Sequence, residues 1–171
     1  MLTSEFLTQV AFFLMAAIAL VGAFLAVSLR NLVRAALGLI LSFLGVAGLY
    51  FILEAEFIGV IQILIYVGAI SILILFAIML TRGLMTSTAS SQNSQWIGAL
   101  LISVLMFVVI GGTVIGTNWA VSPIATNVDF IPKLGTELMT TYLLPFEAVS
   151  LLLLAALVGA IVIAREEVVK K

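Results

Sequence analysis

The segment from Phe57 to Leu80 reads FIGVIQILIYVGAISILILFAIML, and the interpretation of the whole chain starts from it. It contains no Asp, Glu, Lys, Arg or His. It is also long enough to cross a bilayer as a single helix, which takes about 20 apolar residues. The stretch therefore predicts a membrane-spanning helix without an ionisable side chain of these types.

Small and polar residues interrupt this stretch at helical intervals. They are spaced three, four and three residues apart, at Gly59, Gln62, Tyr66 and Ala69. A regular α-helix places such positions on one face. Lipid offers no hydrogen-bond partner to the amide of Gln62 or the hydroxyl of Tyr66. We therefore expect this face to point inward, toward protein or water.

The composition extends this interpretation to the whole chain. Of its 171 residues, 64% are hydrophobic and 9% are charged, whereas soluble domains are about 45–50% apolar and about 25% charged. The apolar runs are long and continuous rather than alternating, which favours helices over a membrane barrel. The sequence predicts an all-α integral membrane protein.

The apolar runs define five transmembrane helices within a single membrane domain, residues 1–171. The predicted spans are about 6–29, 35–53, 57–80, 96–117 and 143–164, with a polar linker at 82–95 and an outer loop at 118–142. Small residues in the second span, among them Gly38, Ser42 and Gly45, indicate close packing against another helix.

The distribution of Lys and Arg predicts the orientation in the membrane. Lys133 is the one basic residue in the segments on one side. The other side holds Arg30, Arg34, Arg82, Arg165, Lys170 and Lys171. Because cytoplasmic segments carry the excess of positive charge, we expect the N-terminus outside and the C-terminus in the cytoplasm.

Several classes of chemistry are excluded by residue type. The chain has no Cys and no His, so it cannot ligate an iron–sulfur cluster through Cys or relay protons through imidazole. Its net charge of -1 gives no electrostatic footprint for nucleic acid. The middles of the spans lack ionisable groups, so a stand-alone proton pump is disfavoured.

Three carboxylates near predicted span ends have alternative interpretations. Glu147, near the start of the fifth span, is either an acid stabilised by the helix dipole or a functional contact. For Glu54 a solvated turn carboxylate is favoured. For Glu56, at the start of the polar-faced helix, the same interpretation competes with a role in a polar path.

Tyr66 and Gly68 also have two interpretations. One is a buried tyrosine bonded to a neighbouring helix, with glycine permitting close packing. The other is a π-bulge, a turn with one extra residue that is common at functional sites. Its conversion to α-helix would rotate one half of the helix by about 100° against the other.

Several motifs resemble subunit J of the proton-pumping NADH:quinone oxidoreductase, respiratory complex I, whose mitochondrial counterpart is chain 6. They are AEF at 55–57, QILIYVGAI at 62–70, LFAIML at 75–80 and LPFE at 144–147. The resemblance covers most of the chain and is weakest in the two long loops.

The resemblance implies a non-catalytic membrane-arm subunit that couples quinone reduction to proton translocation. It implies a switch from π-bulge to α-helix in the third helix, at Tyr66, Val67, Gly68 and Ala69. Glu56 corresponds to the family's acid at the start of this helix, and Gln62 would extend the polar path.

The resemblance also implies partners and cofactors. The partners would be the H subunit of the quinone module, the small A and K subunits, the antiporter-like N subunit, and the lipid bilayer. FMN, iron–sulfur clusters and quinone would belong to the complex, with no cofactor on this chain. The expected location is the bacterial cytoplasmic (inner) membrane, or an energy-converting organelle or thylakoid membrane.

Other functions stay open at this point. One is a subunit of a cation/proton antiporter or membrane-bound hydrogenase, and another is a purely structural scaffold. The sequence does not specify the quinone, the electron donor (NADH or ferredoxin) or the coupling ion.

Overall fold

The computed structural model describes residues 2–81, 95–119 and 130–165, with side chains from residue 5 onward. Every element in these ranges is a helix, and five of the helices are long and apolar enough to cross a membrane. The prediction of an all-α, five-span membrane protein is confirmed. The chain divides into two units, Met1–Phe107 and Val108–Lys171, and each is described by itself.

The helix bounds agree with the predicted spans to within a few residues. We name Glu56–Thr81 the third span; it is continuous and consists of α3, a π-helical segment η1, and α4. The elements are α1 (Leu2–Ser28), α2 (Leu32–Ile52), α3 (Glu56–Ile61), η1 (Gln62–Ile70), α4 (Ser71–Thr81), α5 (Trp96–Gly116), α6 (Phe130–Met139) and α7 (Leu143–Ala164).

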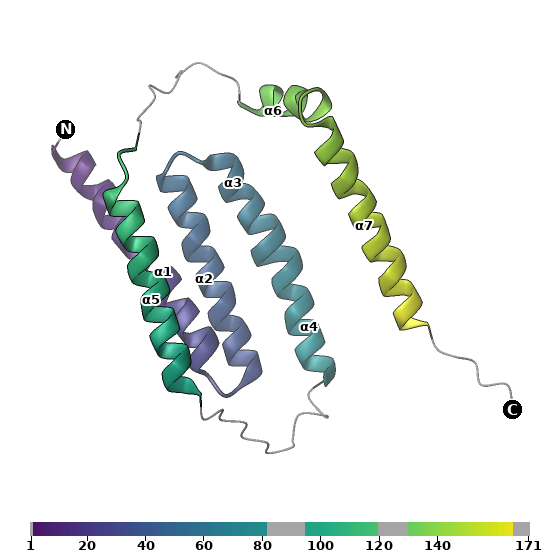
Figure 1. Ribbon diagram of the computed structural model, residues 1–171, viewed down its shortest axis with the longest axis horizontal. Helices are drawn as coiled ribbons and strands as arrows, with labels where there is room; N and C mark the ends of the chain where they lie inside the picture. The colour runs from purple at the N-terminus through teal and green to yellow at the C-terminus, as the bar shows by residue number, and fades with distance from the viewer. Residues whose placement is uncertain (1, 82–94, 120–129, 166–171) are drawn as a thin grey trace, which may run out of the picture. The chain divides into compact units, whose positions relative to one another are not determined.

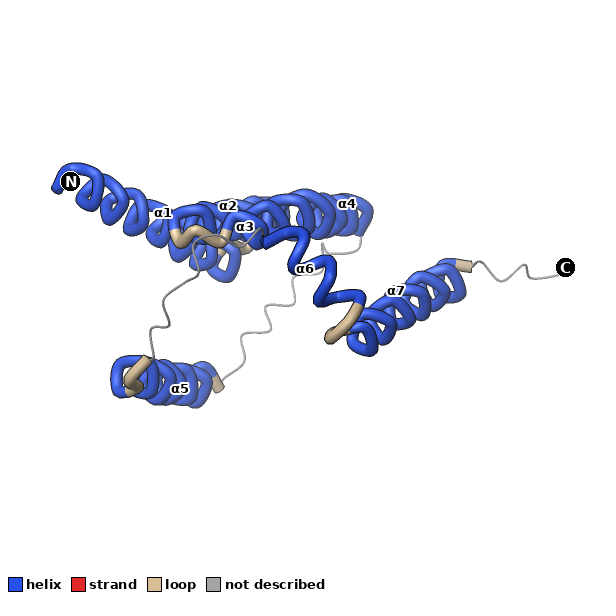
Figure 2. Tube along the Cα trace, turned by 90° about the horizontal axis from the view of Figure 1, so that it is seen from above, coloured by secondary structure: helices blue, strands red, loops and turns tan. Residues whose placement is uncertain are grey.

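In the first unit, α2 lies between α1 and the third span (Figures 1 and 2). Short turns join the three, so their directions alternate. Arg30 and Arg34 lie at one end of α2, and Glu54 and Glu56 lie beyond its other end. The 21 residues of α2 separate these charges by about 30 Å, which is the thickness of a bilayer's hydrocarbon core.

Glycines bring α1 and α2 into backbone contact. A Cβ atom on Gly45 would lie 2.5 Å from the Ala19 backbone nitrogen, and one on Gly22 would collide with the backbone of Ser42. Ala19, Gly22 and Gly45 are accordingly buried. The prediction that small residues of the second span allow a close helix approach is confirmed.

Asn31 fixes the start of α2. Its Oδ1 accepts hydrogen bonds from the backbone N–H groups of Val33 and Arg34, at 3.1 and 3.2 Å. This is N-cap geometry, in which a side chain satisfies donors that have no partner within the helix.

A tight turn after α2 positions the third span. Glu54 adopts a left-handed conformation with φ of 59°, and its N–H donates to the Phe51 carbonyl at 3.2 Å. The Ala55 N–H donates to the Tyr50 carbonyl at 2.9 Å. These two bonds form a Schellman motif, which usually has glycine at the left-handed position.

The second unit contains a short helix within the predicted outer loop. This helix, α6, turns into α7 through residues 140–142, where the Tyr142 N–H donates to the Glu137 carbonyl at 2.8 Å. Pro132 and Pro145 each occupy the first turn of their helix, where proline removes no intrahelical bond. The sequence analysis predicted no helix in this loop.

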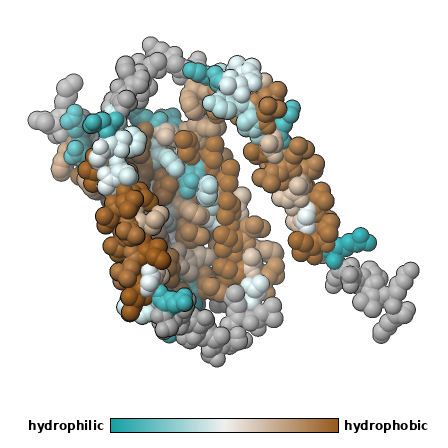
Figure 3. Space-filling view, in the orientation of Figure 1, coloured by the Kyte–Doolittle hydropathy of each residue, from teal (hydrophilic) through white to brown (hydrophobic). Residues whose placement is uncertain are grey.

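The hydropathy of the surface varies along the length of the helices. Apolar side chains cover the visible middles of α4, α5 and α7, and hydrophilic side chains gather toward the helix ends (Figure 3). Arg82, Lys170, Lys171, almost all of the polar linker and part of the outer loop lie outside the described residues. The single membrane domain and the orientation of the termini stay predictions.

Candidate functional site

The candidate site is η1, the π-helical segment in the middle of the third span. It covers nine residues, Gln62–Ile70, with α-helix on both sides. A π-helix bonds each carbonyl to the N–H five residues onward and usually occupies a single turn. The predicted π-bulge is therefore confirmed, and it is longer than the single extra residue that the sequence analysis considered.

The buried residues of the third span show which of its side chains face α2, and η1 changes which residues these are. Gly59, Gln62 and Ser71 are buried, with 8% of Gln62 and 2% of Ser71 exposed. In an α-helix, the nine residue steps from Gln62 to Ser71 would make two and a half turns and place these two residues on opposite sides. The wider π turns complete only about two turns over this distance, so both residues face the same way.

Within this chain, the predicted inward face is consequently buried against α2 only in its first half. Gly59 and Gln62 are buried, but Tyr66 is 42% exposed and Ala69 is exposed. Alpha-helical periodicity assigned Ala69 to this face, whereas the extra residues of η1 carry it away and bring in Ser71. Beyond η1 the least exposed residues are Ser71, Ile74, Leu75 and Ile78, a regular α-helical spacing.

Tyr66 contacts α2 through its ring. The ring centroids of Tyr66 and Phe43 lie 5.4 Å apart at an interplanar angle of 69°, an edge-to-face arrangement. Such pairs contribute about 0.5–1.5 kcal/mol beyond their buried area. The contact positions the middle of η1 against the α2 helix while part of the tyrosine surface stays open.

Ser71 ends η1 with a bond that the sequence analysis did not foresee. Its Oγ donates to the Tyr66 carbonyl at 2.5 Å, and its backbone N–H donates to the Tyr66 and Gly68 carbonyls. The sequence gives little indication that Ser71 faces α2, because α-helical periodicity places Ser71 on the side opposite to Gln62. The buried position of Ser71 could be predicted only by knowing how long the π segment is.

Gly68 has space around it among the described residues. A Cβ atom there would meet a single neighbour, the Ile63 carbonyl oxygen five residues earlier, at an ordinary contact distance of 3.4 Å. Close packing against α2 therefore does not require glycine at this position, in contrast to Gly22 and Gly45. What glycine provides at position 68 is a backbone that deforms easily.

None of the three carboxylates belongs to η1. Glu56 is exposed in the first turn of α3, one turn or more before Gln62, and Glu54 is exposed in the preceding turn. Glu147 is exposed in the second turn of α7, which belongs to the second unit. Of the predicted site residues, the third span thus carries Glu56, Gln62 and the four residues Tyr66 to Ala69 on one helix.

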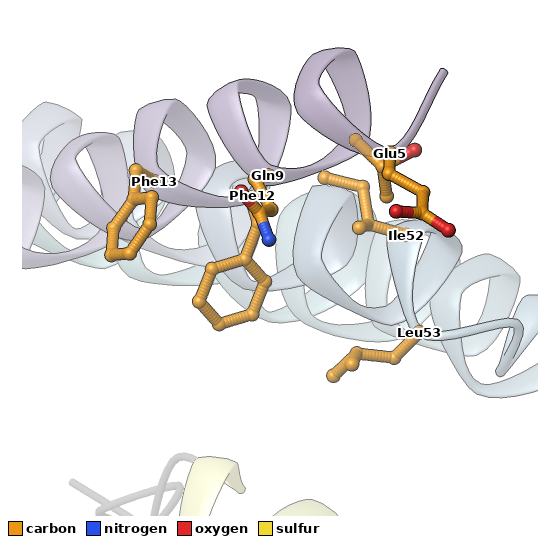
Figure 4. Close-up of a pocket in the computed structure, with 7 residues that line it drawn as sticks. Glu5, Gln9, Phe12, Phe13, Ile52 and Leu53 are labelled. Atoms are coloured by element: carbon orange, nitrogen blue, oxygen red, sulfur yellow. The ribbon is translucent and has the colours of Figure 1, made fainter. Parts of the chain in front are cut away.

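A groove lies at the other side of α2, apart from η1. Its volume is about 690 Å³. Figure 4 shows Glu5 and Gln9 toward the N-terminal end of α1, and the rings of Phe12 and Phe13 farther along the helix. The residues that line it are Glu5, Thr8, Gln9, Phe12, Phe13, Ile52 and Leu53. None of the predicted site residues belongs to this group.

The described residues contain no cluster of three or more His, Cys, Asp or Glu that could hold a metal ion. The site therefore consists of backbone geometry, one amide, one phenol and one hydroxyl. These groups can exchange hydrogen-bond partners and orient water.

Comparisons with known proteins show the family of the chain. Residues 22–163 match the family described as NADH-ubiquinone/plastoquinone oxidoreductase chain 6. The chain is 40% identical over 160 residues to the F(420)H(2) dehydrogenase subunit J of Methanosarcina mazei, covering 91% of this chain and 90% of the relative. It is 41% identical over 161 residues to the NAD(P)H-quinone oxidoreductase chain 6 of Leptolyngbya boryana, covering 92% and 80%.

A chloroplast relative extends the range of organisms. The chain is 36% identical over 174 residues to the NAD(P)H-quinone oxidoreductase subunit 6 of Physcomitrium patens, covering 94% of this chain and 86% of the relative. The family match covers the second, third and fourth membrane helices and almost all of the fifth. The chain is a multi-pass membrane protein and belongs to the chain 6 family of the NADH-quinone oxidoreductases.

Proposed function

We propose that this chain is a membrane-arm subunit that couples quinone reduction to proton translocation through a change of helical register in η1. The observation that carries the proposal is the nine-residue π segment in the middle of an apolar span. A π-helix is rare and is found mostly at functional sites. Its presence here provides a two-state element, since the same residues can also form regular α-helix.

The geometry gives the size of the motion. If η1 converted to α-helix, the residues from Gln62 to Ser71 would make about half a turn more than they do now. Because α3 is held by the turn at Glu54 and Ala55, α4 would rotate against α3. Tyr66 and Ala69 would then change their position relative to α2.

Such a rotation would gate a path for protons without an Asp, Glu, Lys, Arg or His in η1. The Gln62 amide and the Tyr66 hydroxyl can each hold water in a hydrogen-bonded chain. Rotation would move Tyr66 into or out of a water-filled space beside Gln62. Glu56, one turn or more before Gln62, would be the carboxylate at the entrance to this path.

The redox chemistry would belong to other subunits. The chain has no Cys, so its residues do not fit an iron–sulfur cluster, and FMN and quinone would also be bound elsewhere. The proposed partners are the H subunit of the quinone module, the small A and K subunits, and the antiporter-like N subunit. Names of relatives indicate electron donors as different as NAD(P)H and F(420)H(2), so the donor is not assigned.

The proposal predicts a specific effect of Gly68→Val in the intact complex. The Cβ at this position has only one neighbour among the described residues, so the complex should assemble. The stiff valine side chain should shift the equilibrium between the π and α forms of η1, and so uncouple proton translocation from quinone reduction. We expect quinone reduction to continue while the protons translocated per quinone reduced fall several-fold, as measured in sealed vesicles.

Gly112→Val in α5 is the matched control, because a Cβ there has no neighbour within 4 Å among the described residues. This variant should pump normally. Undiminished pumping in Gly68→Val would refute the register switch, and loss of assembly in Gly68→Val alone would favour a purely structural scaffold. Nickel in the purified complex would instead indicate a membrane-bound hydrogenase.

A further inference from the structure

We infer that the hydrogen bond from Ser71 Oγ to the Tyr66 carbonyl stabilises η1 in its π form. We call this hydrogen bond the register latch. Ser71 would be a positioning residue for the switch. The inference rests on the proposed function only for its consequence in proton pumping. The latch itself rests on three observations at the junction between η1 and α4.

The first observation is the span of the bond. Ser71 Oγ donates to the carbonyl five residues earlier, at 2.5 Å. Several other hydroxyls in the described helices bond three or four residues back, as the geometry of a regular α-helix allows. They include Thr81 to Ala77, Thr113 to Ile110, Thr117 to Thr113, Thr136 to Pro132 and Ser150 to Phe146.

The second observation is that two donors of one residue share one acceptor. The Tyr66 carbonyl receives both the backbone N–H and the hydroxyl of Ser71. In α-helical register this carbonyl would instead accept the Ile70 N–H, four residues onward. The Ser71 hydroxyl would then have to turn to another carbonyl, so the present bond belongs to the π register alone.

The third observation is burial. Ser71 is 2% exposed and has the largest side chain among those that are fully buried in the described residues. In the π form the Tyr66 carbonyl satisfies this hydroxyl, which would be unfavourable to bury without a partner. Because conversion of η1 would also carry Ser71 off the α2 face, leaving the π form breaks the bond and removes the hydroxyl from its site.

The latch predicts the effect of Ser71→Ala on the register. Removing one hydrogen bond should lower the ratio of π to α forms about fivefold, equivalent to about 1 kcal/mol. Alanine fits the space of serine and favours helix, so the variant should insert and fold. Ser150→Ala, which removes a hydroxyl bonded four residues back in α7, is the matched control.

Nuclear magnetic resonance can observe the bond directly. Tyr66–Val67 is the only Tyr-Val peptide bond in the sequence. Isotopes placed in the tyrosine carbonyl and the valine nitrogen therefore select this carbonyl in the full chain reconstituted in lipid bilayers. Ser71→Ala should shift its resonance upfield and increase the α-form signal about fivefold, and Ser150→Ala should leave it unchanged.

The same resonance in wild type and Ser71→Ala would overturn the latch, as would an equal shift in Ser150→Ala. If Ser71→Ala does not insert, Ser71→Cys keeps the size and weakens the donor; it should shift the resonance in the same direction by less, and an unchanged resonance would again contradict the latch. Proton pumping is then measured in the intact complex. A shifted register with unchanged protons per quinone would leave the latch standing and refute the proposed coupling.

Discussion

The two sides of α2 meet their neighbours in different ways. Toward α1, the backbones of Gly22 and Gly45 approach so closely that no Cβ atom fits at either position. Toward the third span, contact is made by larger side chains such as Phe43 and by a π-helical segment with room at Gly68. The first interface has no room for a Cβ atom at these glycines, whereas the second has the room at Gly68 that the proposed change of register would need. We name α1 and α2 the platform, and rotation of the third span against this platform is part of the proposed function.

Gly45→Ala should have the largest effect. Its Cβ would lie 2.5 Å from the Ala19 backbone nitrogen, and a clash with backbone is relieved only by separating the helices. We expect a loss of about 1–3 kcal/mol of stability and a several-fold lower yield of assembled complex in membranes. Gly68→Ala, where the Cβ has an ordinary contact, should assemble at the wild-type level. Equal yields for the two variants would contradict the comparison.

Phe43→Ala should have an intermediate effect on the other side of the platform. The substitution removes the edge-to-face contact with Tyr66, which should lower the free energy of unfolding by about 1 kcal/mol in addition to the loss of the area that the ring buries. Thermal unfolding of the purified complex measures the change as a drop of a few degrees. Phe76→Ala, which truncates a 54% exposed ring of α4, is the control. A larger drop for Phe76→Ala would show that the ring contact does not position η1.

Glu54→Gly should have the smallest effect and the opposite sign. Relief of the left-handed conformation gains about 1–2 kcal/mol, and the extra chain entropy of glycine offsets about 0.5–1 kcal/mol of it. The net result is a slightly higher unfolding temperature. Glu54→Ala keeps the Cβ atom and removes the carboxylate, so it should not stabilise. Stabilisation by both variants would show that charge, rather than backbone conformation, is responsible.

Most of the architecture could be predicted from the sequence, because each span is an uninterrupted apolar run. Phe57–Leu80 lies within a residue of the observed third span at each end. The π-bulge near Tyr66 and Gly68 followed from backbone mechanics and the family motif. The glycines of the second span indicated the close contact with α1, although the sequence did not identify that partner.

The features that could not be predicted from the sequence depend on backbone conformations other than the regular α-helix or on short elements that resemble loops. Ala69 was assigned to the inward face and Ser71 was overlooked, because both assignments assumed 3.6 residues per turn. Helix α6 was missed because it is short and contains Pro132 and Gly135, which ordinarily mark a loop. The left-handed Glu54 was missed because that conformation is typical of glycine.

The hydrogen-bonded turn at Glu54 and Ala55 also determines where movement can emerge. It joins the start of α3 to the end of α2 through bonds at Phe51 and Tyr50, and Gly59 lies against the Phe51 ring. These contacts hold the start of the third span to the end of α2, so this end is the one that stays in place when the span twists. Twist generated in η1 would be delivered at Thr81, the opposite end, so a subunit that responds to it should contact the chain there.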